Sequence, residues 1–300
     1  MKGKIILIAE SGSDIPKEIA KELNVILIPM HVCMGTRTYA DGDFPPEYIC
    51  DYYERTGKIP TTSGSTIHDF QTVYDMIFAA NPNAEVLHLA YSSATTCSYH
   101  SSKLALEDKS YKDNVRIIDT KQVSAGQCAV VAAVAAWLKD NPKATLDETA
   151  RIAELMSEET RMCFVPDNLN YLRAGGRCSN ATALVGNLLH LHPCIEIMEG
   201  KLFASRKYRG NMCRIARMLL HDFSHKYDLA RDKIYFIKTP YLNEDICSIL
   251  NEEAMSLGFQ NITWIKTGCV ITCHGGPGAF GIAGYKNNIW IIKDYPLIVE

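Results

Sequence analysis

The chain of 300 residues lacks long hydrophobic runs, and neither sign of charge is in clear excess. Its longest apolar run, Cys128–Leu138, covers eleven residues, whereas a membrane-spanning helix needs about 20. The 31 Lys and Arg residues against 34 Asp and Glu residues give a net charge of −3, without the basic excess that is typical of nucleic-acid-binding proteins. We therefore expect no stable membrane insertion and no nucleic-acid partner.

Closely paired cysteines and secretory features are also missing. The eleven cysteines are scattered and include no C-x-x-C pair, and only five apolar residues separate Met1–Lys4 from Glu10, too few for a signal peptide. Reduced thiols in a cytoplasmic protein are the simplest interpretation. Cys269 and Cys273 precede His274 at a spacing that could suggest a metal, but no second cluster accompanies them, so we predict no metal site.

Common nucleotide and hydrolase motifs are absent as well. The sequence contains no G-x4-G-K-[ST] phosphate loop and no G-x-S-x-G nucleophile elbow. The turn after the first expected strand also lacks G-x-G-x-x-G, the pattern that holds a dinucleotide. We therefore predict no cofactor.

The first half of the chain alternates between apolar runs and helical patterns. Ile5–Ala9 is a continuous apolar run, which is typical of a buried parallel strand, and further strands are predicted at Val25–Pro29, Glu85–Ala90 and Val115–Asp119. Helical patterns follow these runs through residue 140. The rhythm indicates an α/β domain with a mainly parallel, Rossmann-like sheet, which we place at 1–157.

The pattern changes after a helix predicted over Leu146–Glu159. Alternation in Pro193–Met198 and Lys201–Lys207 around Glu199-Gly200 indicates a hairpin. We predict a C-terminal α+β domain at 158–300 with a partly antiparallel sheet, and a ligand in the cleft between the two domains. The other elements predicted in this half are Arg161–Val165, Asn168–Arg173, Ala181–Leu189, Met212–Phe223, Lys233–Lys238, Glu244–Leu257 and Ile262–Lys266.

Four polar turns are rich in hydroxyl or carboxyl groups: Glu10–Asp14, Thr61–Thr66, Ser92–Ser98 and Asp119-Thr120. Ligands of open α/β sheets bind outside the carboxyl ends of the strands, where helix N-termini and hydroxyl donors suit an anion. Ser and Thr are also the preferred helix caps, so each single turn has a purely structural interpretation.

Two further segments suit an anion site. Gly175-Gly176-Arg177 could bring backbone and a guanidinium close to an anion, or could simply be a helix stop. His274 stands in Thr272–Gly278, which we expect to be a constrained turn where the imidazole binds an anion or moves a proton; a structural role is the alternative. His190-x-His192 and His221-x3-His225 are interpreted as solvated or capping residues.

Several of these motifs, in this order, resemble the DegV family of bacterial fatty acid-binding proteins over residues 4 to about 285. The resemblance implies two α/β domains with a fatty acid in the cleft between them. Some members carry the acid for a fatty acid kinase, which converts it to an acyl-phosphate for phospholipid synthesis. The matching segments are the first-strand turn, Tyr39-x-Asp41-Gly42, Thr61-Thr62-Ser63, Ser92-Ser93 through Ser98-Tyr99, Asp119-Thr120, Gly175-Gly176-Arg177, Arg206-x2-Arg209 and His274-x-Gly276-Pro277-Gly278.

The resemblance also implies which residues touch the ligand. The family's carboxylate ligands fall on Thr62 and Thr96, with Ser93, Arg177 and His274 as further ligand-binding candidates. Arg206 and Arg209 are expected to face a partner or the phosphate. Apolar walls for the tail are expected at Phe164, Ile195, Phe280, Ala183-Leu184-Val185 and Leu188-Leu189.

Three features depart from the family pattern. Cys97 follows Thr96 where a glycine is usual, Glu10-Ser11-Gly12 stands where Asp-Ser-Thr is common, and Lys286–Glu300 extends beyond the usual end. We expect Cys97 to narrow the head-group pocket and the longer Glu10 to shift the hydrogen bond made there.

Together these observations predict a cytoplasmic protein that binds a long-chain fatty acid and presents it to a kinase subunit, without being an enzyme itself. The alternative is a small-molecule transferase or hydrolase that acts on a carboxylated or phosphorylated substrate with His274 as acid/base. A DNA-binding regulator has no support, because there is neither a helix-turn-helix pattern nor a basic stripe.

Overall fold

The structure is a computed structural model that describes residues 5–178 and 191–287. The helix expected over Ala181–Leu189 and the wall residues expected at 183–185 and 188–189 lie outside the described residues. The same holds for all of the C-terminal extension after residue 287.

The first half contains a four-stranded sheet of order β2-β1-β6-β7, with all neighbours parallel, as predicted. Its strands are β1 (Ile5–Glu10), β2 (Val25–Ile28), β6 (Glu85–Ala90) and β7 (Val115–Asp119). One face packs on α3 (Ile67–Ala80) and the segment after α4 (Ser98–Leu104), and the other on α1 (Lys17–Glu22), α5 (Ser124–Asp140) and α6 (Leu146–Glu159). Both faces are therefore covered, which explains why apolar residues predominate on both faces of these strands.

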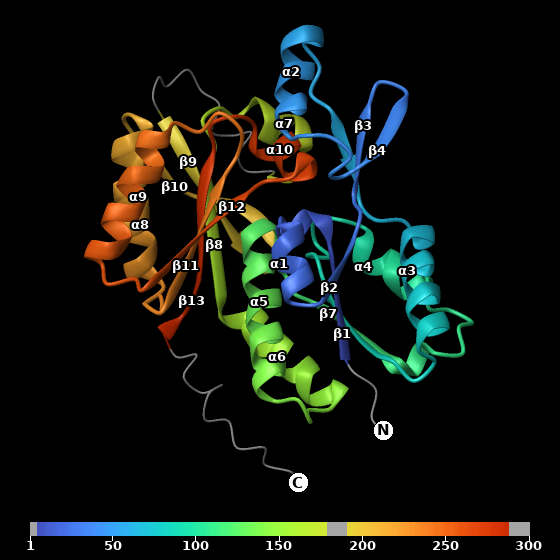
Figure 1. Ribbon diagram of the computed structural model, residues 1–300. Helices are drawn as coiled ribbons and strands as arrows, with labels where there is room; N and C mark the ends of the chain where they lie inside the picture. The colour runs from blue at the N-terminus through green and yellow to red at the C-terminus, as the bar shows by residue number, and fades with distance from the viewer. Residues whose placement is uncertain (1–4, 179–190, 288–300) are drawn as a thin grey trace.

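The second half is built on a six-stranded mixed sheet of order β10-β9-β8-β13-β11-β12, in which only β11 and β12 pair in parallel. Its strands are β8 (Thr160–Val165), β9 (Leu191–Met198), β10 (Lys201–Arg209), β11 (Lys233–Lys238), β12 (Asn261–Lys266) and β13 (Phe280–Tyr285). Helices α8 (Met212–Lys226) and α9 (Glu244–Ser256) cover its outer face, and α5 lies between the two sheets (Figure 1). The predicted α/β plus α+β fold class is confirmed.

A small antiparallel sheet of order β4-β3-β5 was not predicted. It consists of β3 (His31–Met34), β4 (Arg37–Ala40) and β5 (Thr61–Ser63), with α2 (Glu47–Thr56) between the last two. Strands of three or four residues are too short for their periodicity to identify them. Thr61–Ser63 is therefore a strand and not the polar turn that we expected.

The two halves share one hydrophobic core. The buried cluster around α5 includes Leu87 and Leu89 of the parallel sheet together with Met162, Ile237 and Ala283 of the mixed sheet. Near the top of Figure 1, α2 lies close to α7 (Asn170–Gly175) and α10 (Cys269–Gly275) of the second half. The ends of strands from both halves therefore meet around a common space.

Candidate ligand-binding site

A cavity lies between the two halves, where strand ends of the parallel sheet face the mixed sheet. It encloses about 790 Å³ of atom-free space, counted with the solvent at its open mouth. Its residues come from β5, the turn after β6, the start of α5, and β8, β11 and α10 of the second half. The lining is Met30, Thr62, Ser63, Gly64, Tyr91, Thr95, Thr96, Val123, Ser124, Met162, Phe164, Arg177, Leu202, Ile237, Thr239, Thr267, Val270, Ile271, His274, Gly275, Ala279 and Phe280.

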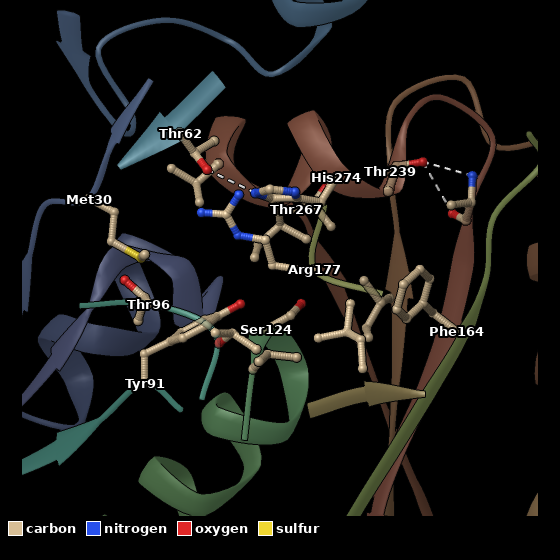
Figure 2. Close-up of a pocket in the computed structure, with 18 of the residues that line it drawn as sticks. Met30, Thr62, Tyr91, Thr96, Ser124, Phe164, Arg177, Thr239, Thr267 and His274 are labelled. Atoms are coloured by element: carbon tan, nitrogen blue, oxygen red, sulfur yellow. Dashed lines mark hydrogen bonds between the residues drawn. The ribbon is translucent and has the colours of Figure 1, made fainter. Parts of the chain in front are cut away.

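Thr62 and His274 form the polar centre of this cavity. The Oγ1 atom of Thr62 lies 2.9 Å from Nε2 of His274 (Figure 2). His274 does not stand on the constrained turn that we expected: it lies in the last turn of α10, directly before the glycines that end the helix. Burial, and to a smaller extent the nearby charge of Arg177, lower the pKa of His274 to about 4, so the imidazole is neutral near pH 7.

The second ring nitrogen of His274 fixes the direction of this hydrogen bond. Nδ1 is buried and has no hydrogen-bond partner. A hydrogen on Nδ1 would be a buried donor without a partner, which is rarer and costlier than a buried acceptor without a partner. We therefore assign the hydrogen to Nε2. His274 then donates to Thr62, and the hydroxyl hydrogen of Thr62 is left to donate into the cavity.

Arg177 and Thr96 also line the cavity, as the resemblance implies. Gly176 ends α7 with a φ of 65° and is the helix stop that we considered, and Arg177 follows it with an exposed side chain at the cavity wall. Thr96 Oγ1 lies 3.2 Å from Ser98 Oγ. A Cβ on Gly64 would stand 2.3 Å from Thr96 Oγ1 and 3.2 Å from Cys97 Sγ, so this glycine lets the Thr96 turn approach closely.

Ser93, Arg206 and Arg209 lie apart from this lining. The hydroxyl of Ser93 donates to the Asp119 carboxylate, and its backbone N–H donates to the same group at 3.2 Å. The guanidinium of Arg206 pairs with Asp222 at 2.6 Å, and Arg209 ends β10 with an exposed side chain. Ligand binding by Ser93 and partner contacts by the two arginines stay predictions.

The apolar part of the cavity is lined by two of the expected wall residues, Phe164 and Phe280. In Figure 2, Phe164 lies at the opposite end of the cavity from Thr62 and His274. Ile195 is instead buried in a cluster with Leu172 and Cys178. The cavity thus has a polar end and an apolar end, as an amphipathic ligand requires.

Several lining residues were missed by sequence analysis, most importantly Tyr91 and Ser124. Tyr91 directly follows β6, and Ser124 opens α5 after β7, so both stand at carboxyl ends of parallel strands. Their position after parallel strands was the signal in the sequence that could have identified them as lining residues. The Glu10 carboxylate accepts from the Tyr91 backbone N–H at 2.8 Å and from Gln127 Nε2 at 3.0 Å, which anchors the Tyr91 turn.

Two carboxylates of the first half hold the start of α10. Asp14 accepts from the Gly268 N–H at 2.7 Å, and Asp41 accepts from the Cys269 N–H at 2.8 Å. Burial raises the pKa of both carboxyl groups. These bonds satisfy otherwise unpaired donors at the helix start and fix the helix that carries His274.

The chain has the fold and the cavity of a two-sheet α/β binding protein, and comparison with known families identifies it further. Residues 4–287 match the family model described as "Uncharacterised protein, DegV family". The chain belongs to the DegV family, as its motifs indicated.

Relatives and solved structures agree with this assignment. A protein of Thermotoga maritima named "Fatty acid-binding protein" is 28% identical over 284 residues, covering 93% of this chain and 96% of the relative. A solved structure described as "Fatty Acid Binding of a DegV family Protein from Thermus thermophilus" superposes with a TM-score of 0.84 at 26% identity, covering 94% of this chain and 99% of that one. A DegV lipid-binding protein of Thermotoga maritima gives a TM-score of 0.78 at 26% identity, covering 94% and 98%.

Two further observations concern membranes and metals. Among residues 5–178 and 191–287, no helix is both long enough and apolar enough to cross a bilayer. The same residues bring together no group of three or more His, Cys, Asp or Glu side chains that could hold a metal ion.

Proposed function

We propose that this protein binds a long-chain fatty acid, with the carboxylate at Thr62 and the tail in the apolar part of the cavity. The observation that carries the proposal is the Thr62–His274 pair at the polar end of a cavity whose other end is apolar. Relatives named as fatty acid-binding proteins support it. They also support a binding protein rather than an enzyme.

The polar end suits a carboxylate without a buried ion pair. Thr62 offers a hydroxyl hydrogen that His274 orients, Thr96 offers a second hydroxyl, and Arg177 supplies a positive charge at the wall. Hydrogen bonds to a charged acceptor contribute about 1.5–3 kcal/mol each. These three side chains are therefore sufficient to select a carboxylate over a methyl terminus at this end.

The apolar end suits an acyl chain. Burying each methylene contributes about 0.8 kcal/mol, so a chain of some 15 methylenes supplies on the order of 10 kcal/mol before ordering costs are subtracted. Met30 and Met162 lie in the lining together with the aromatic and branched side chains. Flexible thioethers adapt to the irregular shape of such a chain.

We further propose that the bound acid is presented to a fatty acid kinase subunit for conversion to an acyl-phosphate. The support is the open mouth of the cavity and the exposed side chain of Arg177 beside the carboxylate site, where it would stabilise charge on a transferred phosphoryl group. The isolated protein is not expected to turn over a substrate. The transferase or hydrolase alternative would require His274 to exchange a proton near neutral pH, and its lowered pKa argues against that.

Calorimetric titration of the delipidated protein with palmitate and with hexadecanol tests the binding proposal. We expect the acid to bind and the alcohol to bind more weakly, because it lacks the charge. Equal binding would reject the carboxylate site, and no binding of either would reject the lipid site. Acyl-phosphate formation with a kinase subunit and ATP tests the presentation role separately.

A further inference from the structure

The hydroxyl groups of Tyr91 and Ser124 belong to the cavity lining but not to the proposed carboxylate site. Tyr91 is 8% exposed and Ser124 is 1% exposed, and both line the cavity. In Figure 2 both lie below the Thr62–His274 pair, away from its hydrogen bond. They come from different elements, since Tyr91 follows β6 and Ser124 opens α5.

The Tyr91 hydroxyl has no hydrogen-bond partner among the described residues, although its surroundings are fixed. Its backbone N–H is held by Glu10, and its ring packs against Gly12, where a Cβ would stand 3.0 Å from Cε2 of the ring. The hydroxyl itself is not among the fully buried side-chain atoms that lack a partner, so it reaches the space of the cavity, and a ligand that covered it would have to supply a hydrogen-bond partner. Here the free hydroxyl belongs to a side chain that faces the cavity.

Tyr91 acts as a donor at any physiological pH. Burial raises the pKa of its hydroxyl, and the carboxylates of Asp14 and Glu10 raise it further. The hydrogen therefore stays on the phenol.

Ser124 supplies an acceptor. Its hydroxyl is hydrogen-bonded to the Asp14 carboxyl group. A hydroxyl has one hydrogen and two lone pairs, so at least one lone pair remains for a ligand whichever of the two residues holds the shared proton. A donor on one side and an acceptor on the other match a neutral hydroxyl group, which can accept from Tyr91 and donate to Ser124.

We propose that the cavity contains a hydroxyl subsite, formed by Tyr91 as donor and Ser124 as acceptor, which selects a long-chain acid that carries a hydroxyl group on its chain. This inference rests on the proposed fatty acid function and specifies its ligand class. An unsubstituted methylene chain would leave the Tyr91 hydroxyl buried without a partner, and sites built around a hydroxyl discriminate strongly against analogues that lack it.

The test compares octadecanoic acid with a series of monohydroxy octadecanoic acids that differ only in the position of the hydroxyl. Titration of the delipidated protein should show at least one isomer binding about tenfold more tightly than the parent acid, as two added hydrogen bonds predict. In Tyr91→Phe the ratio of the affinity for that isomer to the affinity for octadecanoic acid should fall to about one. Ser124→Ala should lower the same ratio and serves as the second variant if Tyr91→Phe folds poorly.

Tyr74→Phe is the matched control. Tyr74 on α3 is fully buried and its hydroxyl also lacks a partner, but it does not line the cavity, so the preference should persist. If octadecanoic acid binds and no isomer exceeds it, or if Tyr91→Phe keeps the preference, the hydroxyl subsite is rejected while fatty acid binding stands. If neither the parent acid nor any isomer binds, both proposals are rejected.

Discussion

Gly175 and His274 are in direct contact, and only a glycine allows it: a Cβ on residue 175 would stand 2.1 Å from Nδ1 of the imidazole. Gly175 is the last residue of α7 and His274 lies in the last turn of α10. The contact places the ring so that its other nitrogen reaches Thr62. The Gly-Gly-Arg segment therefore serves the site through its first glycine as well as through Arg177.

Gly175→Ala should displace the imidazole and break the Thr62–His274 hydrogen bond. We expect fatty acid affinity to fall by about tenfold, in line with the loss of one well-oriented hydrogen bond to a charged group. Titration calorimetry measures this. Gly57→Ala is a control for the loss of a glycine away from the cavity: its φ of 68° makes an alanine strained and should lower stability, but no atom lies within 4 Å of a Cβ there, so affinity should hold. Equal affinity loss in both variants would contradict the account.

Thr62→Val removes the hydroxyl and keeps the shape of the side chain. Affinity for a fatty acid should fall by about tenfold or more, and the midpoint of urea unfolding should change little because Thr62 is only partly buried. Thr72→Val, on an exposed position of α3, is the matched control. Unchanged binding in Thr62→Val would show that the carboxylate lies elsewhere.

Acid should destabilise the protein through His274. Its pKa is about 4 when folded, against about 6.5 in the unfolded chain, so the unfolded state binds more protons between these values. The free energy of unfolding therefore falls as pH drops from 6.5 towards 4, by about 3 kcal/mol for this group. Urea unfolding of the wild type and of His274→Gln across this range measures the contribution, which the variant should lack. If the free energy of unfolding changed with pH in the same way for both proteins, the assignment of a neutral, buried imidazole to His274 would be contradicted.

Cys97 should be the first cysteine to react with iodoacetamide. It is exposed, whereas the other ten are buried or partly buried, and no disulfide is formed. Its Sγ lies against Gly64 beside Thr96, so an added carbamidomethyl group should obstruct the polar end of the cavity and weaken fatty acid binding. Peptide mapping after brief labelling identifies the site.

Cys97→Ser is the control for labelling. This variant should bind fatty acid like the unlabelled wild type and keep that affinity after the same treatment. If the labelled wild type binds as tightly as the unlabelled protein, Cys97 does not border the carboxylate site.

Most of the fold could be predicted from the sequence because buried strands leave a recognisable pattern of apolar residues. Glu85–Ala90, Val115–Asp119 and Lys233–Lys238 begin and end where predicted, since short, mainly apolar segments between polar turns are typical of buried strands. Phe280–Tyr285 was missed because two of its six residues are glycine, which weakens any strand pattern. Its place in the centre of the mixed sheet is set by its neighbours β8 and β11.

The site was harder to predict than the fold. Thr62 and His274 are 212 positions apart, and nothing in their local sequences indicates that they meet. Each stood in a segment that suited an anion, but only the family resemblance assigned both to one ligand. Tyr91 and Ser124 were missed for a different reason. In sequence, a tyrosine after an apolar strand and a serine at a helix start both have ordinary structural roles, and only the structure shows that both residues line the cavity.

The most direct test of the central claim is native mass spectrometry of the protein purified from bacteria, followed by organic extraction and identification of any bound molecule. The account predicts a complex heavier than the 33.5 kDa chain by one long-chain fatty acid, and the same acid in the extract. Recovery of the protein empty, together with no complex after addition of fatty acid, would contradict it.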